Sequence, residues 1–101
     1  MLWAVYCIDK SNTAELREKH LVVHRKYLDE WNSRIFFSGP LQSDGAEISL
    51  GSLFILNVKN RSEAKSFADH EPFNNNGVFA SVTIHRMRKG RYNPDILDVV
   101  S

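Results

Sequence analysis

The stretch that decides the fold is residues 2–31, LWAVYCIDKSNTAELREKHLVVHRKYLDEW, because it contains two different hydrophobic patterns. Its first part, Leu2–Ile8, is a short run rich in β-branched and aromatic residues, which predicts a strand. Its second part, Thr13–Trp31, repeats apolar side chains at helical spacing, which predicts an amphipathic helix. Asn12 and Glu15 have the spacing of a capping box and are expected to begin that helix.

The rest of the chain contains one more predicted helix and three more predicted strands, over residues 62–69 and over residues 35–38, 50–58 and 78–85. Gly39 and Pro40 are expected to stop the second strand, because proline cannot continue a central ladder. Asn60 and Glu63 form a second predicted capping box. The order βαββαβ indicates an α+β sandwich with the helices on one face of a four-stranded antiparallel sheet. With 101 residues, the chain is a single domain.

The predicted strands are apolar on both faces. In the first strand, one face carries Leu2, Ala4, Tyr6 and Ile8, and the other carries Trp3, Val5 and Cys7. An antiparallel sheet with one solvated face should instead alternate apolar and polar residues. Two helices cover only one face, so a second copy of the same sheet is the simplest cover for the other. The pattern therefore predicts a homodimer.

Composition and charge exclude several classes of function. Thirteen Lys and Arg balance twelve Asp and Glu, so the net charge of +1 gives no surplus for binding nucleic acid or an anionic membrane. The single cysteine, Cys7, makes no internal disulfide and is expected to be an inert buried thiol. The N-terminal apolar run is too short to span a membrane and lacks the features of a signal peptide. A cytoplasmic protein is expected.

The candidate chemical groups lie on the apolar side of the first helix. His20 and His24 fall within the apolar arc, and Arg17 lies beside His24. An inward histidine serves either as a general acid/base or as a hydrogen-bonded core residue, and the helix alone does not decide between them. Glu71, before Pro72, is the natural carboxylate partner for His24, with a surface glutamate as the alternative. Arg17 requires an anionic partner, either a carboxylate or a ligand.

Other chemistries have weaker support. Ser38 and Gly39 end a predicted strand with a hydroxyl and with a backbone that a ligand can approach, although an ordinary strand end explains them equally well. The pair His20 and His24 lacks the His-Glu-x-x-His pattern, so no metal site is predicted. The third predicted strand lacks the basic-aromatic signature of RNA-recognition domains, and no phosphate-binding loop or dinucleotide fingerprint occurs. No nucleic-acid partner and no cofactor are therefore expected.

An ordered set of short motifs resembles the YciI-like family, a group of small proteins with a ferredoxin-like fold that form dimeric α/β barrels. The set consists of Arg17 seven residues before His24, Ser38-Gly39-Pro40-Leu41, Asp44-Gly45, Gly51-Ser52-Leu53, Glu71-Pro72-Phe73 and Gly77-Val78-Phe79. The resemblance covers residues 1–88 and leaves a C-terminal extension, residues 89–101. The family's hallmark is a histidine on the first helix and an aspartate just before the proline. Here His24 takes the histidine position, Glu71 replaces the aspartate, and Leu21 replaces a basic residue that relatives often carry.

The resemblance implies a homodimeric, metal-free and cofactor-free enzyme of lyase or isomerase type. Its substrate would be a small anionic or phenolic molecule derived from an aromatic metabolite. His24 would be the general acid/base and Glu71 would orient it, whereas Arg17, Ser38, Gly39 and Phe73 would bind substrate. The alternative is a non-catalytic module that binds a small ligand in the same pocket.

Overall fold

The computed structural model describes residues 1–98 and contains the predicted βαββαβ order. The strands are β1 (Leu2–Asp9), β2 (Ile35–Gln42), β3 (Ser49–Asn57) and β4 (Phe79–Met87). The two long helices are α1 (Ala14–Trp31) and α2 (Arg61–His70). Two short elements add to them, a 3-10 turn (Asn32–Arg34) and the helix α3 (Pro72–Asn75). The last three residues of the predicted extension lie outside the described residues.

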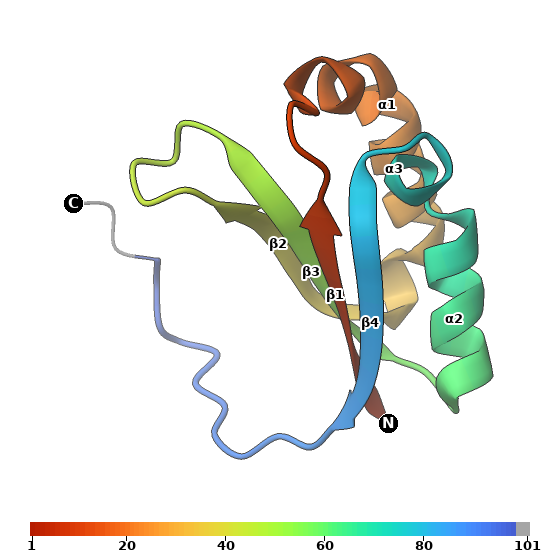
Figure 1. The fold of residues 1–101 in the computed structure, drawn as a ribbon. Coiled ribbons are helices and arrows are strands. Elements are labelled where there is room, and N and C mark those ends of the chain that lie inside the picture. Colours follow the sequence, from red (N-terminus) through yellow and green to blue (C-terminus); the bar gives the residue numbers. More distant parts are fainter. Residues whose placement is uncertain (99–101) are drawn as a thin grey trace.

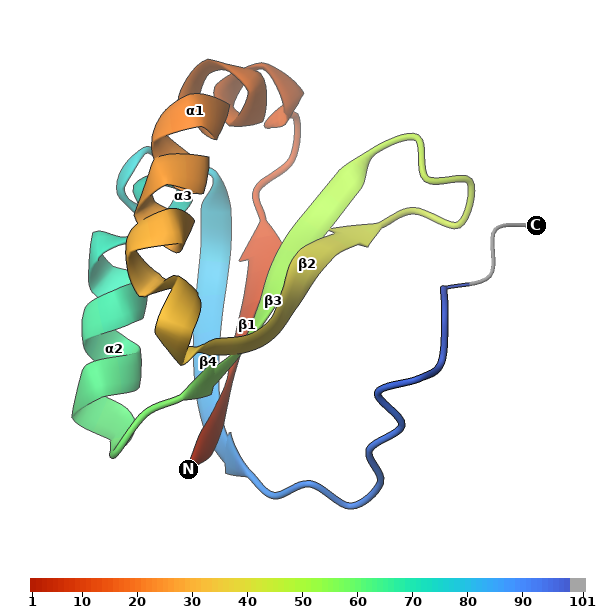
Figure 2. The same ribbon diagram turned by 180° about the vertical axis from the view of Figure 1, so that it is seen from behind.

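The strands form one antiparallel sheet in the order β2-β3-β1-β4. All three helices pack on one face, and the chain beyond β4 passes along the other side (Figures 1 and 2). This arrangement confirms the predicted α+β, ferredoxin-like fold. The pairing of two such sheets in a dimeric barrel stays a prediction.

The hydrophobic core fills the space between the helices and the covered face of the sheet. Val5 of β1 lies opposite Phe54 of β3, and both point toward the helices. Around them pack Trp3, Cys7, Leu56, Ala64, Phe67, Ala68, Phe73 and Val78. Tyr27 joins the two long helices, because its hydroxyl donates a hydrogen bond of 2.9 Å to the carbonyl oxygen of Phe67. Val23 of α1 does not join this core, because its side chain faces solvent.

The prediction that Gly39 and Pro40 stop the second strand was wrong. Strand β2 continues through both residues to Gln42 and pairs with β3 along this length. The reason is its position at the edge of the sheet, where a missing proline N–H need not interrupt a ladder. As a result, Ser38 and Gly39 lie within a strand, and β2 reaches alongside the beginning of β3.

The two predicted capping boxes have different outcomes. Asn60 begins α2 as predicted: its side-chain oxygen accepts the N–H of Glu63 at 2.9 Å, and the Glu63 carboxylate accepts the N–H of Lys59. Asn12 does not cap α1, because its backbone adopts a left-handed conformation with φ of 59°. Thr13 precedes the helix instead, and its hydroxyl donates to the carbonyl of Lys10 rather than capping the first turn.

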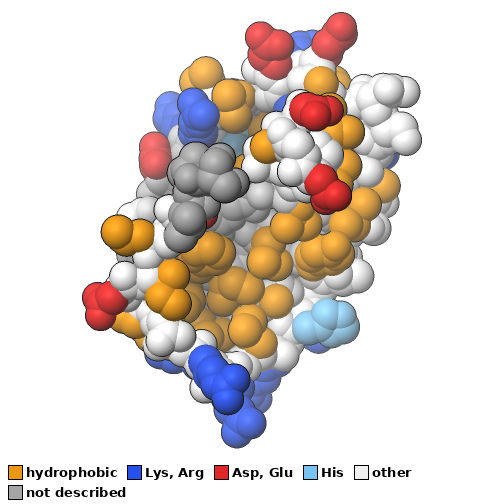
Figure 3. All heavy atoms as spheres, turned by 90° about the vertical axis from the view of Figure 1, so that its left-hand side faces the viewer, with side chains coloured by type: hydrophobic (Ala, Val, Ile, Leu, Met, Phe, Trp, Pro, Cys, Tyr) orange, Lys and Arg blue, Asp and Glu red, His pale blue; other side chains and the backbone are white. Residues whose placement is uncertain are grey.

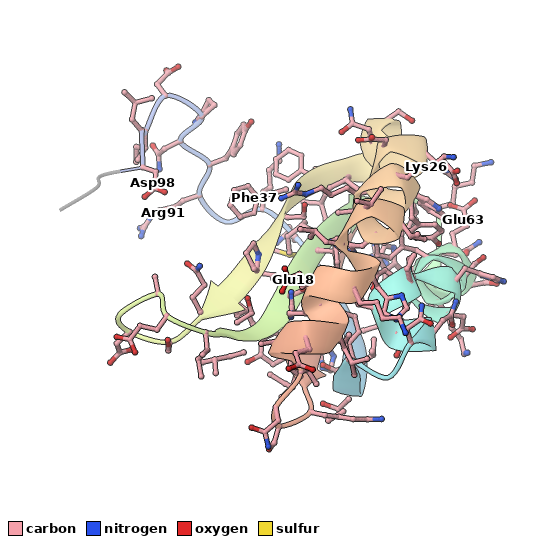
Figure 4. The ribbon with its side chains drawn as sticks, turned by 90° about the horizontal axis from the view of Figure 1, so that it is seen from above. Glu18, Lys26, Phe37, Glu63, Arg91 and Asp98 are labelled. Carbon is pink, nitrogen blue, oxygen red and sulfur yellow. The ribbon has the colours of Figure 1, made fainter. Side chains whose placement is uncertain are left out.

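The uncovered face of the sheet, called here the open face, is rich in apolar side chains (Figure 3). Tyr6 and Phe37 are among its exposed large residues. Figure 4 shows Phe37 on the side away from α1, with Arg91 and Asp98 on the C-terminal segment beyond it. That segment contacts the β2 edge through Tyr92, whose ring centre lies 5.3 Å from that of Phe36. Within residues 1–98, no helix is long and apolar enough to cross a membrane.

Candidate active site

Glu71 lies between α2 and α3 and has an unusual environment for a glutamate. The residue before a proline disfavours the helical conformation, so Glu71 is extended (φ −68°, ψ 126°) and α2 ends at His70. Its Oε2 accepts the backbone N–H of Phe73 at 3.0 Å and that of Asn74 at 3.3 Å, which caps α3. The side chain is only 1% exposed. Glu71 is therefore a buried, fixed carboxylate rather than a surface residue.

The second oxygen of the same carboxylate contacts the histidine singled out from the sequence. Nδ1 of His24 is hydrogen-bonded to Oε1 of Glu71, and the two residues come from α1 and from the α2–α3 junction. Two phenylalanines border the imidazole: Phe73 stacks on it with ring centres 3.9 Å apart and planes 10° apart, and Phe54 approaches edge-on at 6.5 Å. In the tautomer that carries its proton on Nδ1, the imidazole donates to the carboxylate and Nε2 has a free lone pair.

Arg17 is paired with Asp9, not with Glu71. Its Nε donates to Asp9 Oδ2 at 2.7 Å, and one terminal nitrogen donates to Asp9 Oδ1 at 2.9 Å. That nitrogen also donates to the Gly51 carbonyl at 3.0 Å and to the Ser52 hydroxyl at 3.2 Å. The guanidinium thus ties α1 to the ends of β1 and β3. Asp9 is not among the predicted site residues; the usable signal was its position at the end of the first strand.

Gly51 makes this junction possible. A side chain at Gly51 would place its Cβ 2.0 Å from the carbonyl oxygen of Cys7, so only glycine lets β3 approach β1 this closely. The Gly51 carbonyl is thereby held within reach of Arg17.

A cavity of about 500 Å³ lies between α1 and the β2–β3 half of the sheet. Its walls include five of the six predicted site residues, namely His24, Arg17, Ser38, Gly39 and Phe73. The sixth, Glu71, does not line the cavity and contacts His24 from within the core. The rest of the wall consists of Glu18, Leu21, Arg25, Leu28, Pro40, Ser49, Ser52 and Phe54. His20 is half-buried and is not among the residues around this cavity.

Burial suppresses the acidity of two further groups near the core. It raises the pKa of the Cys7 thiol from 9.0 to about 12, and the nearby Glu71 charge adds to the effect. Burial likewise raises the pKa of Tyr27 to about 12, again with a contribution from Glu71. Cys7 is therefore a neutral thiol at physiological pH, as the sequence predicted, and not a nucleophile. In residues 1–98, no cluster of three His, Cys, Asp or Glu side chains is arranged to hold a metal ion.

Comparisons with known proteins agree with the fold, the cavity and the motifs of this chain. The model of the YCII-related domain matches residues 1–88, so the chain belongs to the YCII-related family. Among solved structures, it is similar to the 5-chloro-2-hydroxyhydroquinone dehydrochlorinase TftG of Burkholderia phenoliruptrix AC1100, in complex with 2,5-dihydroxybenzoquinone. The sequences are 26% identical with a TM-score of 0.83, over 89% of this chain and 96% of the dehydrochlorinase. No curated protein matches the chain.

Proposed function

We propose that this chain is a small-molecule enzyme that catalyses an elimination or isomerisation by acid–base chemistry at His24. One observation carries the proposal: the buried Glu71 carboxylate contacts Nδ1, while the same imidazole lines the cavity and its Nε2 has no hydrogen-bond partner in residues 1–98. A histidine oriented by a carboxylate is a general base in many enzymes. The similar dehydrochlorinase, solved with a small quinone, supports lyase-type chemistry on a hydroxylated ring.

In this proposal, Nε2 accepts a proton from the substrate and Glu71 stabilises the imidazolium that forms. In an elimination, the leaving group departs as an anion with the electron pair of its bond, and His24 later returns its proton to solvent. In an isomerisation, His24 returns the proton to a different atom of the same molecule. Neither reaction changes the net oxidation state of the substrate, so the mechanism needs no redox cofactor.

The substrate class follows from the walls of the cavity. Phe54 and Phe73 provide aromatic surface, and Arg17 provides a positive charge beside it. Three of the donated hydrogen bonds of Arg17 end on Asp9 and Gly51, but one terminal nitrogen has no acceptor in residues 1–98. That nitrogen suits an anionic or phenolate oxygen on a small ring. Ser38 and the Gly39 backbone are proposed to contact the opposite side of the substrate.

A non-catalytic binding module is the second candidate, and Glu71 is the observation that favours it. One oxygen of Glu71 caps α3, so the carboxylate contributes to the fold whether or not turnover occurs. The family's aspartate is also one methylene shorter, and such a displacement matters for a catalytic contact.

A turnover screen separates the two candidates. Lactones and halogenated or hydroxylated aromatics are offered to the wild-type protein, to His24→Gln and to His20→Gln, the last being a matched change one turn away on the same helix. The proposal expects turnover by the wild type and by His20→Gln, and its loss in His24→Gln. If His24→Gln turned over the substrate as fast as the wild type, the catalytic role assigned to His24 would be wrong. Ligand binding by native mass spectrometry without turnover of any compound would favour the binding module.

We further propose that the active form is a cytoplasmic homodimer joined through the open face. Tyr6 and Phe37 are 44% and 64% exposed on this face, and exposed apolar surface of this kind marks an interaction site (Figure 3). Size-exclusion chromatography with light scattering gives the mass directly. A monomer at micromolar concentration would overturn this part of the proposal.

A further inference from the structure

The Phe73 ring contacts two of the three basic side chains that α1 contributes to the cavity wall, namely His24 and Arg17. The His24 imidazole stacks on it, and the Arg17 guanidinium carbon lies 4.9 Å from the ring centre. Arg17 and His24 are seven residues apart, which is about two helical turns, so they share one side of α1. The backbone N–H of Phe73 also donates to Glu71. Phe73 is thus linked to the carboxylate through its backbone and to the imidazole through its side chain.

The contact with Glu71 alone does not fix the His24 ring. A single hydrogen bond at Nδ1 holds one edge of the imidazole but permits the ring to turn about that bond. Such a turn would move Nε2, the ring nitrogen that is not bound to Glu71. Face-to-face stacking on Phe73, with the planes 10° apart, restrains this remaining freedom.

Phe73 in turn packs against a guanidinium that is itself held firmly. Asp9 binds two nitrogens of Arg17, and their side chains are only 4% and 13% exposed. The Gly51 carbonyl and the Ser52 hydroxyl accept from the same guanidinium. An arginine with these four contacts has one position available, so it presents a fixed surface to the Phe73 ring.

We propose that Phe73 and Asp9 are positioning residues for His24: Asp9 fixes Arg17, Arg17 supports the Phe73 ring, and that ring sets the plane of the imidazole. The effect on rate rests on the proposed function, whereas the effect on the orientation of the ring does not. Phe73 is therefore assigned two roles: it contacts the substrate, and it holds the His24 ring in place.

The orientation of His24 is measured by NMR of its ring protons in the full chain, assigned with His24→Gln. A proton held over the face of a phenyl ring is shifted upfield. Phe73→Leu keeps an apolar side chain but removes the ring, so the upfield shift of His24 should disappear. Phe73→Tyr keeps the ring and should retain the shift.

Asp9→Asn tests the link from Asp9 through Arg17 to Phe73 without changing the stacked pair of Phe73 and His24. It removes the charge that holds Arg17, so the His24 shift should decrease by less than in Phe73→Leu. The matched control is Asp69→Asn, which removes a carboxylate from the exposed pair with Lys65 and should leave the shift unchanged. Thermal unfolding checks that each variant is folded, and Arg17→Lys replaces Asp9→Asn if the latter is not.

Kinetics with any substrate from the screen provide the second readout. In Phe73→Leu, kcat should fall about 10- to 100-fold with a smaller change in KM, because a misplaced base slows the chemical step more than binding. Phe73→Tyr should restore kcat. A His24 shift that Phe73→Leu leaves unchanged would overturn the positioning role. The expected shifts without any turnover would contradict only the proposed enzyme.

Discussion

The two faces of the sheet are built from the same strands and from similar residues, yet their side chains are in opposite environments. Val5 is completely buried under the helices, whereas its neighbour Tyr6 is 44% exposed on the open face. Three of the buried polar residues, His24, Glu71 and Ser52, lie on this covered side. Each of them is hydrogen-bonded, which burial requires. The contrast teaches that the helices bury one face together with its candidate site, whereas the other face keeps exposed apolar side chains beside the C-terminal segment.

The largest expected effect is a difference in stability between two variants, each of which lacks a phenylalanine on one face of the sheet. Phe54→Ala on the covered face should lower the free energy of unfolding by about 3–5 kcal/mol, because it leaves a cavity in the core. Phe37→Ala on the open face should change monomer stability by less than about 1 kcal/mol. Urea unfolding at low protein concentration measures both values.

Phe37→Ala should nonetheless weaken the proposed dimer, with a dissociation constant raised about tenfold or more. Analytical ultracentrifugation measures this change. Equal dimer affinity in Phe37→Ala and the wild type would contradict the assignment of the open face as the interface.

The next effect concerns the buried carboxylate. Glu71→Gln keeps the size of the side chain but removes the negative charge. This carboxylate is hydrogen-bonded to His24 and to two backbone N–H groups. We expect a loss of about 2–3 kcal/mol in unfolding free energy, since hydrogen bonds to charged groups are the stronger ones. Asp69→Asn, in a solvent-exposed pair on α2, should cost less than about 0.5 kcal/mol. Equal costs would show that burial does not distinguish these carboxylates.

A smaller effect is expected at the start of α2. Asn60→Ala removes the oxygen that accepts the Glu63 N–H and should cost about 1 kcal/mol. Asn12→Ala removes no helix cap, so any effect would come from its left-handed backbone alone. Chemical denaturation of the two variants distinguishes a true cap from one that only the sequence spacing suggests.

The smallest predicted effect is one of reactivity. Burial raises the pKa of Cys7 from 9.0 to about 12, so the neutral thiol is the form that the folded state favours. The contribution of this neutral thiol to the free energy of unfolding is complete below pH 9 and is lost as the pH rises toward 12. Iodoacetamide should label Cys7 slowly at pH 8 in the folded protein and rapidly in urea. Rapid labelling of the folded protein would show that the covered face is open to solvent.

The sequence predicted much of the covered face, because hydrophobic spacing reports directly on which residues point inward. The contact between His24 and Glu71 could be anticipated, since Pro72 disfavours a helical backbone at Glu71. The catalytic role of the two residues stays a prediction. Asp9 was missed because its partner Arg17 is close in space only once β1 and α1 are packed together. Pro40 was misjudged because a sequence does not state which strand lies at the edge of a sheet.

The most direct test of the account is the turnover of a compound from the screen by His24→Gln, compared with the wild type and with His20→Gln. General acid–base catalysis contributes about 10²- to 10⁴-fold. The account therefore predicts that kcat falls by this factor in His24→Gln, with little change in KM, and is retained in His20→Gln. A His24→Gln protein with the wild-type kcat would contradict it.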